Sequence, residues 1–147
     1  MKIILPAIVY WLSVNFGLPA NYDLPRIEHA STDKMLALRY RDVSAPRAAK
    51  AGSLGTYRSV VALYDTSTKT IFLSKKWTGQ TPTEMSILVH EMVHHLQNVG
   101  GLTFACPQER EKLAYEAQER WLKLFGHDLE HDFDLDRFTL LVTTNCM

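Results

Sequence analysis

The stretch from Thr81 to Asn98 constrains the fold more than any other, because it combines a metal-ligand spacing with strong helix signals. It contains the pattern H-E-x-x-H as His90, Glu91 and His94. Residues four apart lie on the same face of a helix, so both imidazoles can reach one ion. Neutral imidazole nitrogens are good zinc ligands, and Glu91 is placed to act as a base toward a water molecule at the metal. The pattern therefore predicts a metal site on a helix.

The flanking residues supply the helix that this pattern needs. Thr81 is a favourable N-cap, Pro82 suits the first helical position, and Glu84 completes a T-x-x-E capping box. Gly100 and Gly101 are expected to end the helix. Apolar residues recur at helical spacing and predict one core-facing stripe, made of Met85, Leu88, Val89, Met92, Leu96 and Val99. The alternative is a buried helix whose histidines only satisfy hydrogen bonds.

Length and charge narrow the class of protein. A chain of 147 residues is expected to form a single domain, residues 1–147, with a sizeable core. Lys and Arg together number 16, as do Asp and Glu, and no basic stripe is present. We therefore expect neither nucleic acid nor a membrane surface as a partner.

The cellular location of the protein depends on two features for which the sequence leaves alternatives open. Residues 1–20 resemble a signal peptide, with Lys2 before an apolar run and Ala20 as a cleavage residue, but Leu18 is unfavourable three residues before the cut. A short first helix that ends at Gly17 is the preferred interpretation. The two cysteines, Cys106 and Cys146, either form one disulfide, which favours export, or remain free thiols in a cytoplasmic protein.

The chain before the motif mixes helices and strands. We predict a strand over residues 26–30, a helix over 33–41 and a flexible connection over 42–55. Two strand-like runs follow, at 57–64 and 70–77, with turn-forming residues between them.

These two runs predict a β-hairpin directly before the motif helix. Lys75 and Lys76 near the end of its second strand indicate a solvent-facing edge strand. Such an edge can hold an extended peptide by strand addition, and a plain edge strand is the alternative.

A catalytic zinc needs a third protein ligand, and helical phase selects one. Residues 107–125 are strongly helical, and five charged residues fall on one solvated face: Glu109, Lys112, Glu116, Arg120 and Lys123. Glu111 lies on the opposite, mostly apolar face, where a carboxylate needs a partner because burying it alone is costly. Ala114, one turn later, allows a close approach to the motif helix. Glu111 is therefore the first candidate and Glu116 the second.

These two motifs resemble those of a known family. H-E-M-V-H followed by E-K-L-A is similar to the H-E-x-x-H plus E-x-x-A arrangement of the gluzincin metallopeptidases, and to small bacterial proteins of this minimal type. The resemblance covers about residues 57–125. It implies His90, His94 and Glu111 as the ligands of one Zn²⁺ per chain and Glu91 as the catalytic base. Tyr115 stands where many such families continue with Asp, and little chain follows the second helix.

Several further residues have open roles. An oxyanion donor is needed for peptide hydrolysis, and the candidates are Tyr115, Tyr57, Tyr64, His95 and His127. Gln97 or Gln118 can orient a ligand imidazole.

A second histidine motif lies near the end of the chain. His127, Glu130 and His131 spell the inverted pattern H-x-x-E-H, which we interpret as a chance match in a polar surface loop. Residues 134–147 are expected to pack as a last helix or strand.

Taken together, these patterns predict an α+β, minimal zincin-like domain, with a β-hairpin before the H-E-x-x-H helix and a ligand-bearing helix after it. The expected function is zinc-dependent hydrolysis of a peptide bond in a peptide or protein substrate, which makes the protein a metallopeptidase. One alternative is a zinc-binding regulatory or interaction module with little turnover. The other is a metal-free structural domain.

Overall fold

The computed structural model describes residues 1–41 and 61–146. Within these residues the chain forms six helices and a three-stranded sheet, so the protein is α+β as predicted. It divides into two compact units, one made of Met1–Leu24 with Gly79–Met147 and the other of Pro25–Thr78. The single domain over residues 1–147 stays a prediction.

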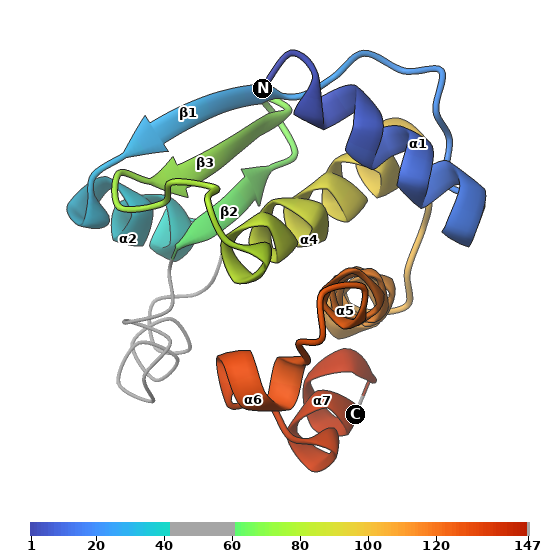
Figure 1. Cartoon of the computed structure of the whole chain (residues 1–147). Helices are drawn as coiled ribbons and strands as arrows, with labels where there is room; N and C mark the ends of the chain where they lie inside the picture. The colour runs from blue at the N-terminus through green and yellow to red at the C-terminus, as the bar shows by residue number, and fades with distance from the viewer. Residues whose placement is uncertain (42–60, 147) are drawn as a thin grey trace. The chain divides into compact units, whose positions relative to one another are not determined.

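The unit Pro25–Thr78 carries the sheet. It contains β1 (Arg26–Ala30), α2 (Thr32–Arg41), β2 (Ala62–Asp65) and β3 (Thr70–Ser74). The strand order is β1-β3-β2, with β1 parallel and β2 antiparallel to β3. β2 and β3 form the predicted hairpin directly before the motif helix (Figure 1).

One prediction for this sheet was wrong. β3 is the central strand and all five of its residues are buried, because β1 pairs with its free side. Lys75 and Lys76 follow β3 in a turn and are exposed there. The lysines therefore mark the end of a central strand, and strand addition along β3 is excluded. The predicted connection over 42–55 and the beginning of the predicted strand at 57–64 lie outside the described residues.

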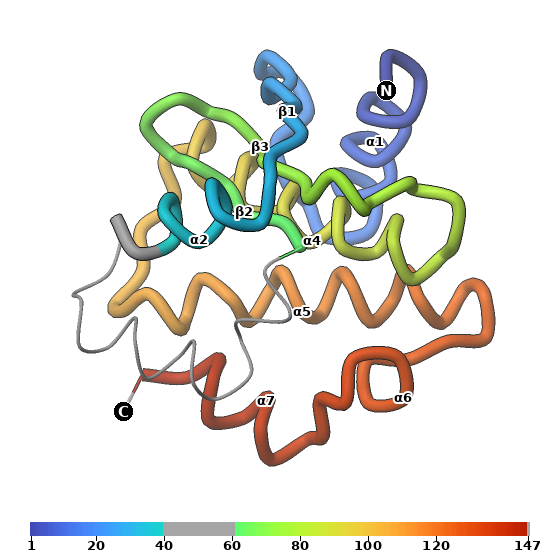
Figure 2. The backbone as a smooth tube through the Cα atoms, turned by 90° about the vertical axis from the view of Figure 1, so that its left-hand side faces the viewer, coloured from blue at the N-terminus to red at the C-terminus, as the bar shows by residue number. Residues whose placement is uncertain are grey.

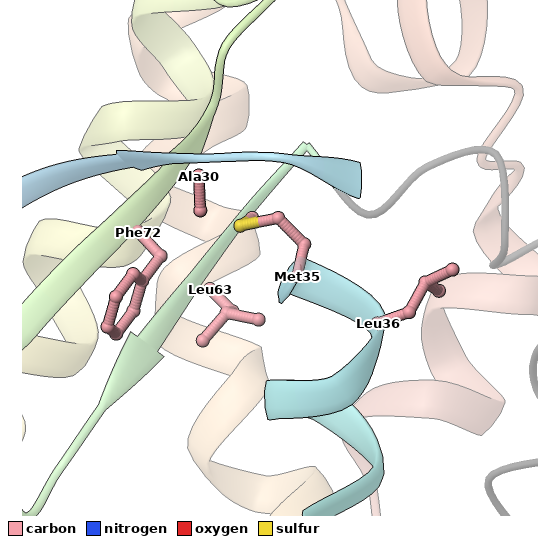
Figure 3. Packing of buried hydrophobic residues seen from close by; sticks show 5 residues of the cluster. All are labelled: Ala30, Met35, Leu36, Leu63 and Phe72. Atoms are coloured by element: carbon pink, nitrogen blue, oxygen red, sulfur yellow. The ribbon is translucent and has the colours of Figure 1, made fainter. Parts of the chain in front are cut away.

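The core of this unit lies between the sheet and α2. Ala30, Met35, Leu36, Leu63 and Phe72 are buried together, with one residue from β1, two from α2 and one from each of the other strands. Figure 3 shows Met35 reaching from α2 towards Ala30 and Leu63. The predicted helix start is also explained, since the Ser31 hydroxyl accepts a hydrogen bond from the backbone N–H of Lys34 at 3.3 Å.

The other unit is made of helices: α1 (Ile4–Phe16), α4 (Pro82–Val99), α5 (Pro107–Lys123), α6 (Leu129–Phe133) and α7 (Arg137–Thr144). α1 and α5 both pack against α4, and α6 and α7 both lie against α5 (Figures 1 and 2). α1 ends at Gly17, whose φ of 68° is the left-handed C-cap conformation that glycine adopts readily. The predicted first helix is therefore present.

α4 begins where the capping signals predict. The Thr81 hydroxyl accepts from the backbone N–H of Glu84 at 3.1 Å, and the Glu84 carboxylate accepts from the N–H of Gly79 at 2.7 Å. The prediction of a single core-facing stripe was wrong, however, because α4 is buried on nearly every face from Leu88 to Gln97. α1 and α5 both pack against α4, and both histidines lie among its buried residues.

A disulfide joins Cys106 to Cys146, so the open question of their pairing is answered in the structure. Cys106 is the N-cap residue of α5, and Cys146 lies just beyond α7. The last segment contains a helix, one of the two predicted alternatives, but the apolar side chains of Phe138 and Leu141 are 74% and 61% exposed instead of packed. Among the described helices, none combines the length and apolar character that a membrane span requires.

Candidate metal centre

Three ligand-type side chains converge between α4 and α5. His90 and His94 come from successive turns of α4, and Glu111 comes from the beginning of α5. Glu111 Oε1 lies 3.0 Å from His90 Nε2, and Glu111 Oε2 lies 2.7 Å from His94 Nε2. In the described part of the chain, this is the one group of three such residues whose ligand atoms all lie within 4.8 Å of one another. The structure therefore brings together the three residues that the sequence analysis selected, while Glu116, the second candidate, is exposed elsewhere on α5.

The local sequence explains why these side chains meet. The four-residue spacing on α4 places the two imidazole rings 5.0 Å apart, centre to centre. Ala114 and Ala117 on the facing side of α5 are fully buried. Because a methyl group is all that each contributes, α5 can approach α4 closely enough for Glu111 to reach both histidines.

The second nitrogen of each histidine also has a partner. His90 Nδ1 lies 2.9 Å from Gln118 Oε1, and His94 Nδ1 lies 3.0 Å from Gln97 Oε1. The side chains of His90 and His94 are 11% and 10% exposed, whereas that of Glu111 is 31% exposed. The group is therefore reached by solvent mainly from the Glu111 side.

Electrostatics favour a charged Glu111. Burial alone would raise the pKa of this carboxyl, but the hydrogen bonds from His90 and His94 outweigh burial and hold its pKa well below the usual range. Burial likewise opposes a charge on His94, but the hydrogen bond with Glu111 and the negative charges of Glu111 and Glu91 raise the pKa of His94 overall. A positive charge between the imidazoles and the carboxylate is thus stabilised by this arrangement.

The group fits a metal ion. Two imidazole nitrogens and one carboxylate oxygen are a donor set that catalytic zinc sites use, with a fourth position left open. Tetrahedral coordination at about 2.0–2.1 Å would place neighbouring donors roughly 3.3–3.5 Å apart. The contacts of 2.7 and 3.0 Å would lengthen by roughly 0.3–0.8 Å to reach this spacing, in a group whose ligand atoms all lie within 4.8 Å of one another. The His90, His94 and Glu111 cluster can therefore bind a metal ion.

Of the other site candidates, two lie next to the cluster. Glu91 is 8% exposed, and its charge acts on His94. The ring of Tyr115 meets the ring of His90 edge-on, with centroids 4.6 Å apart.

The remaining candidates are placed elsewhere. His95 is 1% exposed and donates from Nε2 to the backbone carbonyl of Asp23 at 2.8 Å, so it anchors the segment after α1. Tyr64 belongs to β2, and Tyr57 lies outside the described residues. His127 pairs with Asp132 at 2.8 Å.

The inverted motif lies partly in a short helix, α6, and not wholly in the loop that we expected, since His127 and Asp128 precede that helix. His127 Nδ1 and His131 Nδ1 both meet the carboxylate of Asp132, at 2.8 and 3.2 Å. The same carboxylate accepts from the Thr83 hydroxyl at 2.6 Å. Within residues 1–41 and 61–146 these side chains do not form a second metal-ligand group. Asp132 therefore ties α6 to the first turn of α4.

One residue behind the cluster was missed in the sequence analysis. Ser86 is fully buried, and its hydroxyl accepts from Gln118 Nε2 at 3.1 Å. The sequence did contain a signal for Ser86, because this residue precedes His90 by four residues and so lies on the same face of the helix. A polar residue at that place in an otherwise apolar run indicates a hydrogen-bond partner nearby.

Comparison with known protein families gives one match. The family described as "Domain of unknown function (DUF6647)" matches over residues 1–147. The chain belongs to this family. Comparisons with curated proteins and with solved structures gave no match. The gluzincin resemblance and the peptidase activity that it implies stay predictions.

Proposed function

We propose that this protein is a zinc-dependent peptidase whose metal is held by His90, His94 and Glu111. One observation carries the proposal: two buried imidazoles turn the same ring nitrogen, Nε2, towards the two oxygens of one carboxylate. Two imidazoles that converge on one point, beside a further carboxylate at Glu91, are typical of hydrolytic zinc sites.

The three ligands and the metal have separate tasks. His90 and His94 offer neutral nitrogens from a rigid helix, and Glu111 supplies the negative charge from the neighbouring helix. When bound, zinc supplies Lewis-acid chemistry, which polarises a carbonyl group and acidifies water. The partial exposure of Glu111 provides the side from which a peptide can approach.

Glu91 is the proposed general base and acid. Its carboxylate accepts a proton from the water molecule whose oxygen bonds to the carbonyl carbon of the substrate. The same proton then passes from the Glu91 carboxyl to the amide nitrogen as the C–N bond breaks, so that a carboxylic acid and an amine are released. Water and one peptide bond are consumed, and Glu91 returns to its charged form.

The test compares Glu91→Gln with the wild type after both are loaded with zinc. The amide keeps the size of the side chain but cannot take up the proton, so cleavage of a quenched-fluorescent peptide library should fall by about 10²–10⁴-fold. Zinc content, measured by elemental mass spectrometry, should stay near the wild-type value because Glu91 is not a ligand. Glu116→Gln on the exposed face of α5 is the matched control and should change neither quantity.

Two results would contradict the proposal in different ways. Equal cleavage by the wild type and Glu91→Gln would remove Glu91 from the reaction. A zinc-loaded wild type that cleaves no peptide in the library would favour the regulatory or interaction module over the peptidase.

A further inference from the structure

Two buried glutamine side chains lie behind the two histidines. Gln97 of α4 is 1% exposed and Gln118 of α5 is 4% exposed. Each directs its amide oxygen towards a histidine Nδ1, and each has a second partner for its amide nitrogen. A buried amide without partners is costly, so these contacts determine how each amide is turned.

The Gln97 amide has one possible orientation. The backbone carbonyl of Arg110 lies 3.1 Å from its other end, and a carbonyl oxygen can only accept a hydrogen bond. The NH₂ end of Gln97 must therefore face Arg110, which leaves Oε1 against His94. Because Oε1 can also only accept, His94 Nδ1 carries the hydrogen.

The same reasoning applies to Gln118 through one more residue. The Ser86 hydroxyl has a single hydrogen, and it donates this to the backbone carbonyl of Thr83 at 2.6 Å. Ser86 Oγ must then accept from Gln118, so the NH₂ end of Gln118 faces Ser86 at 3.1 Å. Gln118 Oε1 is left to accept from Nδ1–H of His90.

We infer that Gln97 and Gln118 are positioning residues that select Nε2 as the metal-binding nitrogen of His94 and His90. A hydrogen held on Nδ1 leaves Nε2 as the nitrogen with a free lone pair in the neutral ring. In both histidines it is Nε2 that faces Glu111. The inference rests on the metal-binding part of the proposed function and requires no catalysis.

The two amides also connect the helices in opposite directions. Gln97 reaches from α4 to the backbone of Arg110, the residue before Glu111, so it holds the third ligand as well as His94. Gln118 reaches from α5 to His90 and Ser86 on α4. Each glutamine therefore sets the direction of one imidazole and the distance between the ligand-bearing helices.

The first experiment measures zinc affinity by competition with a chromophoric chelator. Gln97→Leu and Gln118→Leu remove the acceptor at similar size, and each should weaken zinc binding by about 10–100-fold. Gln118→Glu keeps an acceptor for the hydrogen on His90 Nδ1 and should recover most of that loss. Gln108→Leu, at an exposed position near the start of α5, is the matched control and should bind zinc like the wild type.

The second measurement needs no substitution, which protects the test if a leucine variant fails to fold. Long-range proton–nitrogen spectra of the ¹⁵N-labelled, zinc-loaded wild type report which ring nitrogen of each histidine carries a hydrogen. His90 and His94 should both carry it on Nδ1. A hydrogen on Nε2 of either residue would overturn the inference, as would folded leucine variants with wild-type zinc affinity.

These outcomes separate the inference from the proposed function. Wild-type protein that binds no zinc overturns both. Zinc binding that the glutamine substitutions leave unchanged overturns the inference alone. Zinc-loaded protein with the expected Nδ1 hydrogens but without peptide cleavage overturns the peptidase proposal alone.

Discussion

Two groups of two histidines and one carboxylate lie in the same helical unit and differ in almost every physical respect. The α4–α5 group consists of His90, His94 and Glu111, and the α6 group consists of His127, His131 and Asp132. In the first, the carboxylate meets two Nε2 atoms of histidines that are about one-tenth exposed. In the second, it meets two Nδ1 atoms of histidines that are 39% and 88% exposed.

The difference shows which features fit the α4–α5 group to a metal ion. In the α4–α5 group the far nitrogens are occupied by buried amides, so both rings are held in place and their near nitrogens converge. In the α6 group the carboxylate of Asp132 is shared with the Thr83 hydroxyl and its histidines extend into solvent. Each group combines two histidines with one carboxylate, and buried amides hold the far ring nitrogens in the α4–α5 group.

The largest expected effect is the loss of zinc from Glu111→Ala. Without the carboxylate only two ligands remain, so affinity should fall by more than the roughly 10–100-fold that loss of a supporting residue costs. Asp132→Ala should leave zinc binding intact, because among the described residues the α6 side chains do not form a metal-ligand group. Elemental mass spectrometry of both variants, with Glu116→Ala as the exposed control, measures this. Loss of zinc from Asp132→Ala alone would reverse the assignment of the two groups.

The next effect is stabilisation by zinc itself. A ligand that binds only the folded state stabilises it by about 4 kcal/mol at a free concentration of 1,000 times its Kd. Thermal unfolding followed by circular dichroism should therefore show a higher midpoint with zinc than with a chelator in the wild type and in Asp132→Ala. Glu111→Ala should show the same midpoint under both conditions. A wild type that is indifferent to chelation would support the metal-free structural domain.

The disulfide should stabilise the folded state by a somewhat smaller free energy than zinc does. It holds the beginning of α5, the helix that carries Glu111, and so belongs to the support of the α4–α5 group. Cys106 and Cys146 are 40 residues apart, and closing a loop of that length stabilises by about 2–4 kcal/mol. Cys146→Ser should lower the free energy of unfolding by that amount in urea titrations. Alkylation of the unreduced wild type should label no cysteine, and two labelled cysteines in the mass spectrum would disprove the bond.

The smallest effect is expected from Asp132. Its removal deprives Thr83 and His127 of their acceptor, so Asp132→Ala should lower the free energy of unfolding by roughly 1–3 kcal/mol. Glu130→Ala, at an exposed position of the same short helix, is the control. Equal unfolding midpoints in the two variants would show that Asp132 does not tie α6 to α4.

The stability of the same variant, Asp132→Ala, should also depend on pH differently from that of the wild type. The pKa of Asp132 is held below its usual value, first by the hydrogen bond from Thr83 and then by those from His131 and His127. A lowered folded-state pKa stabilises the protein above the unfolded-state value of about 3.9 and ceases to do so as the pH falls through the lower value. Asp132→Ala should therefore lose less stability than the wild type on acidification below about pH 4, measured by urea unfolding at several pH values.

Much of the local structure followed from the sequence. The capping box at Thr81 and Glu84 predicted the start of α4, and charge periodicity predicted the exposed face of α5 on which Glu116 lies. The same periodicity singled out Glu111, because a carboxylate on an apolar face needs a partner. Such signals are local, since they depend on residues within one or two turns of each other.

Other features depended on contacts between distant segments. Hydrophobic spacing on α4 indicated a stripe, but α4 is buried on nearly every face from Leu88 to Gln97, and both α1 and α5 pack against it. The sequence of β3 indicated an edge strand, yet β1 pairs with it from 44 residues earlier in the chain and makes it central.

The sequence by itself determined which residues have metal-binding chemistry and which helices carry them. Side-chain type and helical phase depend only on residues that are near one another in the chain. Only the tertiary structure decided that Glu111 reaches both Nε2 atoms and that Gln97 and Gln118 occupy both Nδ1 atoms. Those contacts join residues on two different helices, and hydrogen-bond direction between helices depends on how closely the helices pack. The sequence already set the inverted motif aside, and the structure adds that His127 and His131 are 39% and 88% exposed, whereas His90 and His94 are about one-tenth exposed.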